Sequence, residues 1–273
     1  MVARDTPAAG GRDLALRRLW FWAGSLLVAA GVVMHLPMFF GARDMGYVLA
    51  GMPIDPLMVA GMVLIGAGLA GVVYGLSPTR EQRRKRVRTA VQMTALDDTP
   101  IGRQHILLMT VLCVAVAVDS QKPFTFTFIL PGVASEYHLS SPGHSVPGAL
   151  PVALYPFVAI VGTVIGSLAW GTIGDLLGRR MAVLLSAILF MATSICGAMP
   201  LYALNLVMCF WMGVGAGGLL PTAYALLAEI VPARRRGQII VLVAGIGTGL
   251  GFLLTSGLAN WTMPHFGWRI MWF

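Results

Sequence analysis

The sequence predicts an all-α integral membrane protein with about seven transmembrane helices. Hydrophobic residues make up 57% of the 273 residues and charged residues only 11%, whereas an ordinary soluble domain carries roughly 25% charged residues. Apolar runs of about 20 residues recur along the whole chain, and each is long enough to cross a bilayer core of roughly 30 Å. The formal net charge of +8 does not indicate nucleic-acid binding, because the basic residues lie between the apolar runs.

The first two spans are predicted at residues 19–40 and 54–76. An arginine pair precedes the first run, as in a signal peptide, but the run is too long for one and no small-residue cleavage site follows it. We therefore expect an uncleaved helix. A loop at 79–105 follows the second span, and we expect its basic run REQRRKRVR (80–88) to rest on anionic lipid.

Five further spans are predicted after this loop, at 106–130, 149–170, 181–199, 204–228 and 238–258. Single prolines within them are compatible with transmembrane helices, because neighbouring helices can satisfy the freed backbone groups. Pairs of glycines four residues apart predict close packing between helices. These pairs are Gly71/Gly75, Gly162/Gly166, Gly213/Gly217 and Gly245/Gly249.

The distribution of basic residues predicts a cytoplasmic N-terminus. With that end inside, all of the 19 Lys and Arg residues lie in inside segments except Arg43, Lys122 and Arg269. Such an asymmetry sets the orientation of multi-pass proteins. We expect a multi-pass protein of the cell membrane, that is, of an inner or plasma membrane, with the lipid bilayer as its surroundings.

The residues that usually carry enzymatic or cofactor chemistry do not form recognisable motifs. Cys113, Cys196 and Cys209 lie inside apolar runs without a CxxC or Cys/His cluster, so we expect neither a disulfide nor a metal site. No HExxH or GxSxG motif lies in a span, and the last span has no lysine for a retinal Schiff base. We predict that the protein is not an enzyme and needs no cofactor.

The stretch GTIGDLLGRR (171–180) places charges and glycines at one short inside turn between two spans. Its glycines permit close approach or unusual backbone angles. Its aspartate can accept hydrogen bonds from N–H groups at the start of the next helix, where an anion is favourable. The residues of interest are Gly174, Asp175, Gly178, Arg179 and Arg180. A generic charged turn that obeys the positive-inside rule is the alternative interpretation.

A second stretch, GVGAGGLLPTAYALLAEIVPARRRGQ (213–238), is rich in glycine and ends in a basic cluster. Glu229 lies at the inside end of its helix, where the helix dipole disfavours an anion. The carboxylate therefore needs a cation, and Arg179, Arg180 and Arg236 all belong to the same membrane face. We expect a carboxylate–guanidinium cluster that ties the two inside loops together.

Together these stretches resemble the major facilitator superfamily of transporters, especially its sugar and organic-acid branches. GDLLGRR is similar to the signature between the second and third core helices, and GVGAGG with the following Pro, Glu, Pro and RRRG is similar to the fourth helix and its loop. GWRIMWF (267–273) is similar to the entry of the sixth helix. The resemblance covers residues 106–273 and implies an N-terminal half, truncated at the start of its sixth helix. Residues 1–105 would be two extra helices and a basic cytoplasmic loop.

Charged residues also lie inside a span, in the stretch VAVDSQKPFTFTF. Asp119 and Lys122 each cost roughly 2.5–3.5 kcal/mol at a helix centre, and at i and i+3 they can pair. The resemblance implies that an acidic residue in the first core helix takes part in proton coupling. Asp119, Gln121 and Lys122 are therefore candidates for substrate and proton coupling. The alternatives are a self-satisfied pair that fixes helix packing, or a lysine that reaches out to the interface.

The resemblance implies a secondary transporter with alternating access, namely a proton-coupled symporter of a small organic solute such as an organic acid or a sugar. The residues Gly174, Asp175, Gly178, Arg179, Arg180, Glu229 and Arg236 would then be the latch, whose contacts differ between inward-open and outward-open states. Because the chain stops at Phe273, we expect a C-terminal half or partner subunit. The alternative is a truncated, non-transporting membrane scaffold or regulatory subunit. The residues leave symport and antiport both open.

Overall fold

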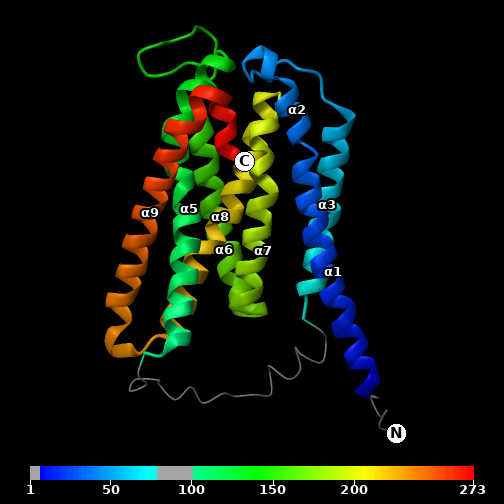
Figure 1. Ribbon diagram of the computed structural model, residues 1–273, viewed down its shortest axis with the longest axis vertical. Helices are drawn as coiled ribbons and strands as arrows, with labels where there is room; N and C mark the ends of the chain where they lie inside the picture. Colours follow the sequence, from blue (N-terminus) through cyan, green and yellow to red (C-terminus); the bar gives the residue numbers. More distant parts are fainter. Residues whose placement is uncertain (1–6, 79–100) are drawn as a thin grey trace.

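The computed structural model describes residues 7–78 and 101–273, and in that part of the chain the spans are long, roughly aligned helices (Figure 1). The expected basic run at 80–88 lies outside the described residues. The α-helices are α1 (Pro7–Val33), α2 (Leu36–Gly41), α3 (Pro56–Leu76), α5 (Arg103–Glu136), α6 (Leu154–Leu177), α7 (Arg179–Ala192), α8 (Tyr202–Ile230) and α9 (Arg236–Phe266). Short 3₁₀ helices occupy Arg43–Met45, Thr193–Ala198, Ala233–Arg235 and Trp268–Trp272.

Seven helical segments of the described chain are long and apolar enough to cross a membrane, which confirms the all-α membrane class. They follow the predicted order, although the third and seventh extend beyond their predictions of 106–130 and 238–258, and the fourth is shifted from its prediction of 149–170. It begins at Leu154, because residues 149–153 form a turn, and it continues to Leu177. GTIGDLL is thus the last part of α6, and Gly178 alone separates α6 from α7.

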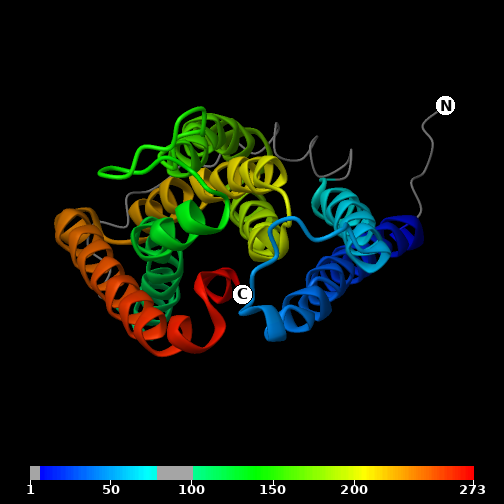
Figure 2. The same cartoon turned by 90° about the horizontal axis from the view of Figure 1, so that it is seen from above.

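The two ends of the bundle differ in charge. The N-terminus, the start of α5, the α6–α7 junction and the α8–α9 junction lie at one end (Figure 1). This end, here called the basic end, carries Arg17, Arg18, Arg103, Arg179, Arg180, Arg234, Arg235 and Arg236. Residues 42–55, 137–153 and 267–273 lie at the opposite end. Seen from above, α1 and α3 form a pair beside the other five spans (Figure 2).

Glycines bring helices into backbone contact in two places, as the glycine pairs predict. In α6 and α8, a Cβ atom at Gly162 would overlap the carbonyl of Phe210, and one at Gly213 would overlap the carbonyl of Ala159. In the α1–α3 pair, a Cβ at Gly75 would lie 2.5 Å from the backbone nitrogen of Phe21. Such contacts allow the dispersion and Cα–H contacts on which helix association in lipid depends.

The prediction of close packing is wrong for Gly245 and Gly249 in the described structure. Nothing lies within 4 Å of a Cβ atom built at either residue. The face of α9 that packs against α5 carries Gly247 and Gly251 instead, next to Val116 and Ala117. One turn offers several small residues, so a glycine spacing alone does not identify the packed face.

A single buried apolar cluster joins the α1–α3 pair to α7. It includes Val28 and Val72 from the pair and Leu185 and Ile188 from α7. Two further clusters fill the space between α5, α6 and α8 at the opposite end and between α5, α8 and α9 at the basic end. The charged residues described next lie between or beside these clusters.

Candidate functional site

The intramembrane ion pair lies in α5. The Nζ atom of Lys122 donates to Oδ1 of Asp119 at 2.7 Å, and the two side chains are 8% and 9% exposed. The i,i+3 spacing therefore produces the expected pairing. Lys122 does not reach outward to the interface. Because Pro123 has no backbone N–H, the helix gives up a hydrogen bond directly after this pair.

Residues of α7 and α9 contribute to the surroundings of the pair. The Lys122 ammonium lies 3.1 Å from the ring centroid of Phe190 in α7, which is a cation–π contact in an apolar region. One residue along from Asp119, the hydroxyl of Ser120 lies 3.4 Å from that of Thr248 in α9. Gln121 is half-buried, and its backbone carbonyl accepts from the Thr125 hydroxyl at 2.8 Å. The arrangement holds a cation against one carboxylate and one aromatic face.

At the basic end, Arg179 bridges two carboxylates from different helices. Its Nη2 atom lies 2.9 Å from Asp175 at the end of α6, and its Nε atom lies 3.4 Å from Glu229 near the end of α8. Gly174 is buried beneath the guanidinium, and a Cβ there would lie 3.3 Å from Nη1. Gly178 adopts φ +103°, which non-glycine residues rarely tolerate. Both glycines therefore shape the short junction that aims Arg179.

The structure corrects two details of the expected latch. Arg180 and Arg236 are exposed, and neither pairs with a carboxylate of the described residues, so only Arg179 joins the cluster. Asp175 accepts from the Arg179 side chain rather than from backbone N–H groups. The reason is that α6 continues through Asp175, which places this carboxylate one helical turn before Arg179 instead of at a helix start.

A third charged cluster, at the opposite end, is absent from the sequence predictions. Arg269 is fully buried and its Nη2 atom donates to Glu136 at 2.7 Å. Glu136 also accepts from the indole N–H of Trp268 at 2.8 Å. The backbone N–H groups of Leu49 and Ala50 donate to the same carboxylate at 2.8 and 2.9 Å. Glu136 thus connects the α1–α3 pair, α5 and the segment after α9.

Further polar contacts saturate this cluster. The Nη1 atom of Arg269 donates to the carbonyls of Gly197 and Met199 at 2.9 and 3.0 Å, and Nη2 also donates to the Tyr137 hydroxyl at 2.9 Å. Burial raises the pKa of Tyr137, so the hydroxyl keeps its proton and donates it to the carbonyl of Met199 at 2.9 Å. A saturated buried network of this kind stabilises one arrangement of its helices.

The fold defines a multi-pass α-helical membrane protein with charged groups buried among its helices. In the described residues, no group of three His, Cys, Asp or Glu side chains could hold a metal ion. A model of the Major Facilitator Superfamily matches residues 107–273. The chain belongs to this superfamily.

Several transporters and related membrane proteins are similar to about two thirds or more of this chain. The niacin transporter NiaP of Acinetobacter baylyi is 28% identical over 65% of this chain and 39% of its own length. The 4-hydroxybenzoate transporter PcaK of the same organism is 29% identical over 66% of this chain and 39% of its own. Human synaptic vesicle glycoprotein 2A is 28% identical over 74% of this chain and 28% of its own length. The chain therefore spans less than half the length of these relatives. No solved structure matches the chain.

Proposed function

We propose that this chain forms the N-terminal part of a proton-coupled secondary transporter that takes up a small organic acid. The observation that carries the proposal is the buried Asp119–Lys122 pair in the middle of α5. In this proposal, residues 106–273 form the transporting core and residues 1–105 supply two extra helices and a basic loop. The basic end lies on the cytoplasmic side of the cell membrane, that is, of an inner or plasma membrane. A C-terminal half or partner subunit completes the solute path.

The pair couples a proton to an anion by charge balance. When Asp119 is ionised, it neutralises Lys122 at 2.7 Å. When Asp119 takes up a proton, Lys122 keeps its charge without a partner, and a charge at this depth costs roughly 2.5–3.5 kcal/mol. A carboxylate of the substrate can then replace Asp119 beside the ammonium. Loss of the proton returns Lys122 to Asp119 and releases the anion, so proton and substrate travel in the same direction.

The relatives support an acid rather than an uncharged sugar as the solute. The named solutes of the two bacterial relatives are niacin and 4-hydroxybenzoate, both aromatic carboxylic acids. An aromatic carboxylate suits a site that already combines the Lys122 ammonium with the Phe190 ring at 3.1 Å. Gln121, next in the chain to Ser120, supplies a half-buried amide for orienting the solute.

At the basic end, the latch responds to the conformational change. Arg179 links the ends of α6 and α8 by contacts of 2.9 and 3.4 Å to exposed carboxylates. Such contacts are individually weak and are screened by salt, which suits a connection that must open and close in each cycle. Gly174 and Gly178 keep the junction short, while Arg180 and Arg236 remain available for the other state.

Transport by proteoliposomes tests this proposal. The 273-residue chain is reconstituted alone and with a C-terminal six-helix half, and uptake of labelled niacin, 4-hydroxybenzoate and glucose is followed under an inward proton gradient. We expect accumulation of the acids. Asp119→Asn should still exchange labelled for unlabelled acid across the membrane, but it should not accumulate acid, whereas Lys122→Gln should lose both activities. Asp44→Asn, an exposed substitution at the opposite end, is the matched control.

Two outcomes contradict different parts of the proposal. Accumulation by Asp119→Asn at the wild-type level would refute proton coupling through this residue. Absence of uptake and exchange with either preparation, despite correct folding, would refute transport itself and favour a non-transporting scaffold or regulatory subunit. Accumulation of glucose but not of the acids would refute the substrate class.

A further inference from the structure

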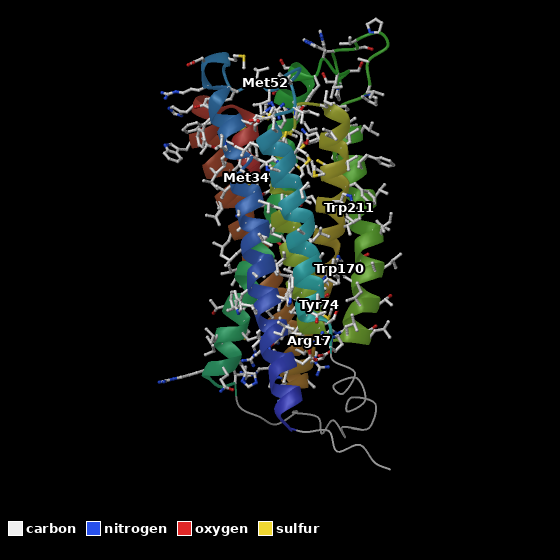
Figure 3. All side chains as sticks on the ribbon, turned by 90° about the vertical axis from the view of Figure 1, so that its right-hand side faces the viewer. Arg17, Met34, Met52, Tyr74, Trp170 and Trp211 are labelled. Carbon is white, nitrogen blue, oxygen red and sulfur yellow. The ribbon has the colours of Figure 1, made fainter. Side chains whose placement is uncertain are left out.

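A cavity at the basic end separates the α1–α3 pair from the α6–α7 junction. Its volume is about 930 Å³, and its lining comes from α1, from the end of α3 and from both sides of Gly178. Toward this end α1 diverges from α7, while the two helices lie closer at mid-height (Figure 1). Arg17 and Tyr74 mark the α1–α3 side of the same end in Figure 3. The cavity is the space between the α1–α3 pair and the core at the end where they diverge.

Positive charge dominates the lining of this cavity. Four arginines, Arg17, Arg18, Arg179 and Arg180, face it together with one carboxylate, that of Glu229. Two of the four arginines already have partners. Arg17 donates to the carbonyls of Tyr74 and Ser77 and lies 3.4 Å from Asp13, and Arg179 pairs with Asp175 and Glu229.

The remaining two guanidinium groups, those of Arg18 and Arg180, are exposed, and neither forms an ion pair within the described part of the chain. They come from opposite walls of the cavity, one from α1 and one from the first turn of α7. An anion in the cavity would therefore find two uncommitted cations, one on the extra pair and one on the core.

Apart from Ser77, the rest of the lining is apolar. It includes Leu14, Phe21, Trp22, Leu76, Met181 and Leu184. At its rim, Leu14 is 43% and Trp22 is 65% exposed, and tryptophan is the side chain that favours the boundary between lipid and water. A ligand that fits must combine an anionic head with long hydrocarbon chains, because a small hydrophilic anion would leave this wall uncovered.

We propose that this cavity binds an anionic phospholipid, with the phosphate at the arginine-lined mouth and the acyl chains against the apolar wall. Basic cavities between transmembrane helices hold such headgroups in general. The bound lipid fills the wedge between the α1–α3 pair and the core and supplies the negative charge that Arg18 and Arg180 lack. The site shares Arg180 and other residues with the proposed latch, but its test requires no uptake, so the two proposals can fail separately.

Native mass spectrometry of the full chain in detergent tests this proposal. Phosphatidylglycerol and phosphatidylcholine with identical acyl chains are titrated separately, and the bound fraction gives an apparent Kd for each lipid. We expect phosphatidylglycerol to bind more tightly. Arg18→Gln and Arg180→Gln should each weaken it about fivefold, which is the attraction expected for one arginine near an anionic headgroup. Arg43→Gln, which removes an exposed arginine at the opposite end, should leave the Kd unchanged.

Three results would overturn the proposal. Equal binding of the two lipids would show that the negative charge is not recognised. An equal loss in Arg43→Gln and Arg18→Gln would indicate general surface attraction instead of a site. Displacement of phosphatidylglycerol by millimolar inorganic phosphate would assign the cavity to a free anion. Arg18 and Arg180 are exposed and form no ion pair in the described structure, so these variants are expected to fold, and circular dichroism verifies this.

Discussion

Replacement of Glu136 by alanine should destabilise the protein far more than replacement of any exposed carboxylate. The side chain of Glu136 is 5% exposed and that of Arg269 is 0% exposed. The substitution leaves the Arg269 guanidinium buried without a counter-charge, which typically costs 3–5 kcal/mol. It also removes the acceptor for the Leu49 and Ala50 N–H groups. We therefore expect a rise of about two to nearly four orders of magnitude in the unfolding equilibrium constant, from about 1.4 kcal/mol per factor of ten.

Glu229→Ala provides the matched comparison. Glu229 is 46% exposed and makes one 3.4 Å contact with Arg179, and an exposed pair of this kind contributes about 0–1 kcal/mol. Both variants are unfolded in mixed micelles by SDS, with intrinsic tryptophan fluorescence as the probe. Hydrogen exchange at Leu49 and Ala50 provides a local readout and should speed up only in Glu136→Ala. Equal destabilisation by the two substitutions, or unchanged exchange at these amides, would refute the role assigned to the Glu136 cluster.

Two further predictions concern packing and the same cluster. Gly162→Val should destabilise the α6–α8 contact by several kcal/mol, since its Cβ would overlap the Phe210 carbonyl. Gly245→Val should change the SDS midpoint little, because its surroundings are open. Similar SDS midpoints for the two variants would contradict this packing. Tyr137→Phe should cost about 1–3 kcal/mol by leaving buried partners unsatisfied. Burial raises the pKa of Tyr137, so the folded state holds this proton more tightly than the unfolded state does. The free energy of unfolding of the wild type should therefore fall as the pH rises above the ordinary tyrosine pKa, and that of Tyr137→Phe should fall less. Parallel pH profiles of the two proteins would contradict this.

The features that the sequence predicted correctly are those that depend on local spacing. Each span follows from a long, mainly apolar run, and the Asp119–Lys122 contact follows from a separation of three residues on one helix. The pairing of Glu229 with an arginine was predicted from charge and membrane side, with Arg179 as one of three candidates. Local rules could not tell which arginine would pair, since that depends on how far α6 continues before Gly178 ends it.

The Glu136 cluster shows what such rules leave out. Two signals were present, a carboxylate at the end of a span and the Gly-Trp-Arg stretch near the end of the chain. The bonded residues are 133 positions apart, and no spacing rule connects positions at that distance. The turn at Leu49 and Ala50 is equally remote from Glu136 in sequence, by 87 and 86 positions. Only the assembled bundle brings the three segments together.

This separation imposes an order on biosynthesis. Glu136 enters the nascent chain after Leu49 and Ala50 but 133 residues before Arg269. At a translation rate of about 5–20 residues per second, the carboxylate waits about 7–27 s for its cation. During that interval the α1–α3 hairpin has its amide donors in place, yet burial of the uncompensated carboxylate is unfavourable. We therefore expect the hairpin to close onto the core only after the ribosome has delivered Arg269, so that synthesis of this arginine precedes the last step of assembly.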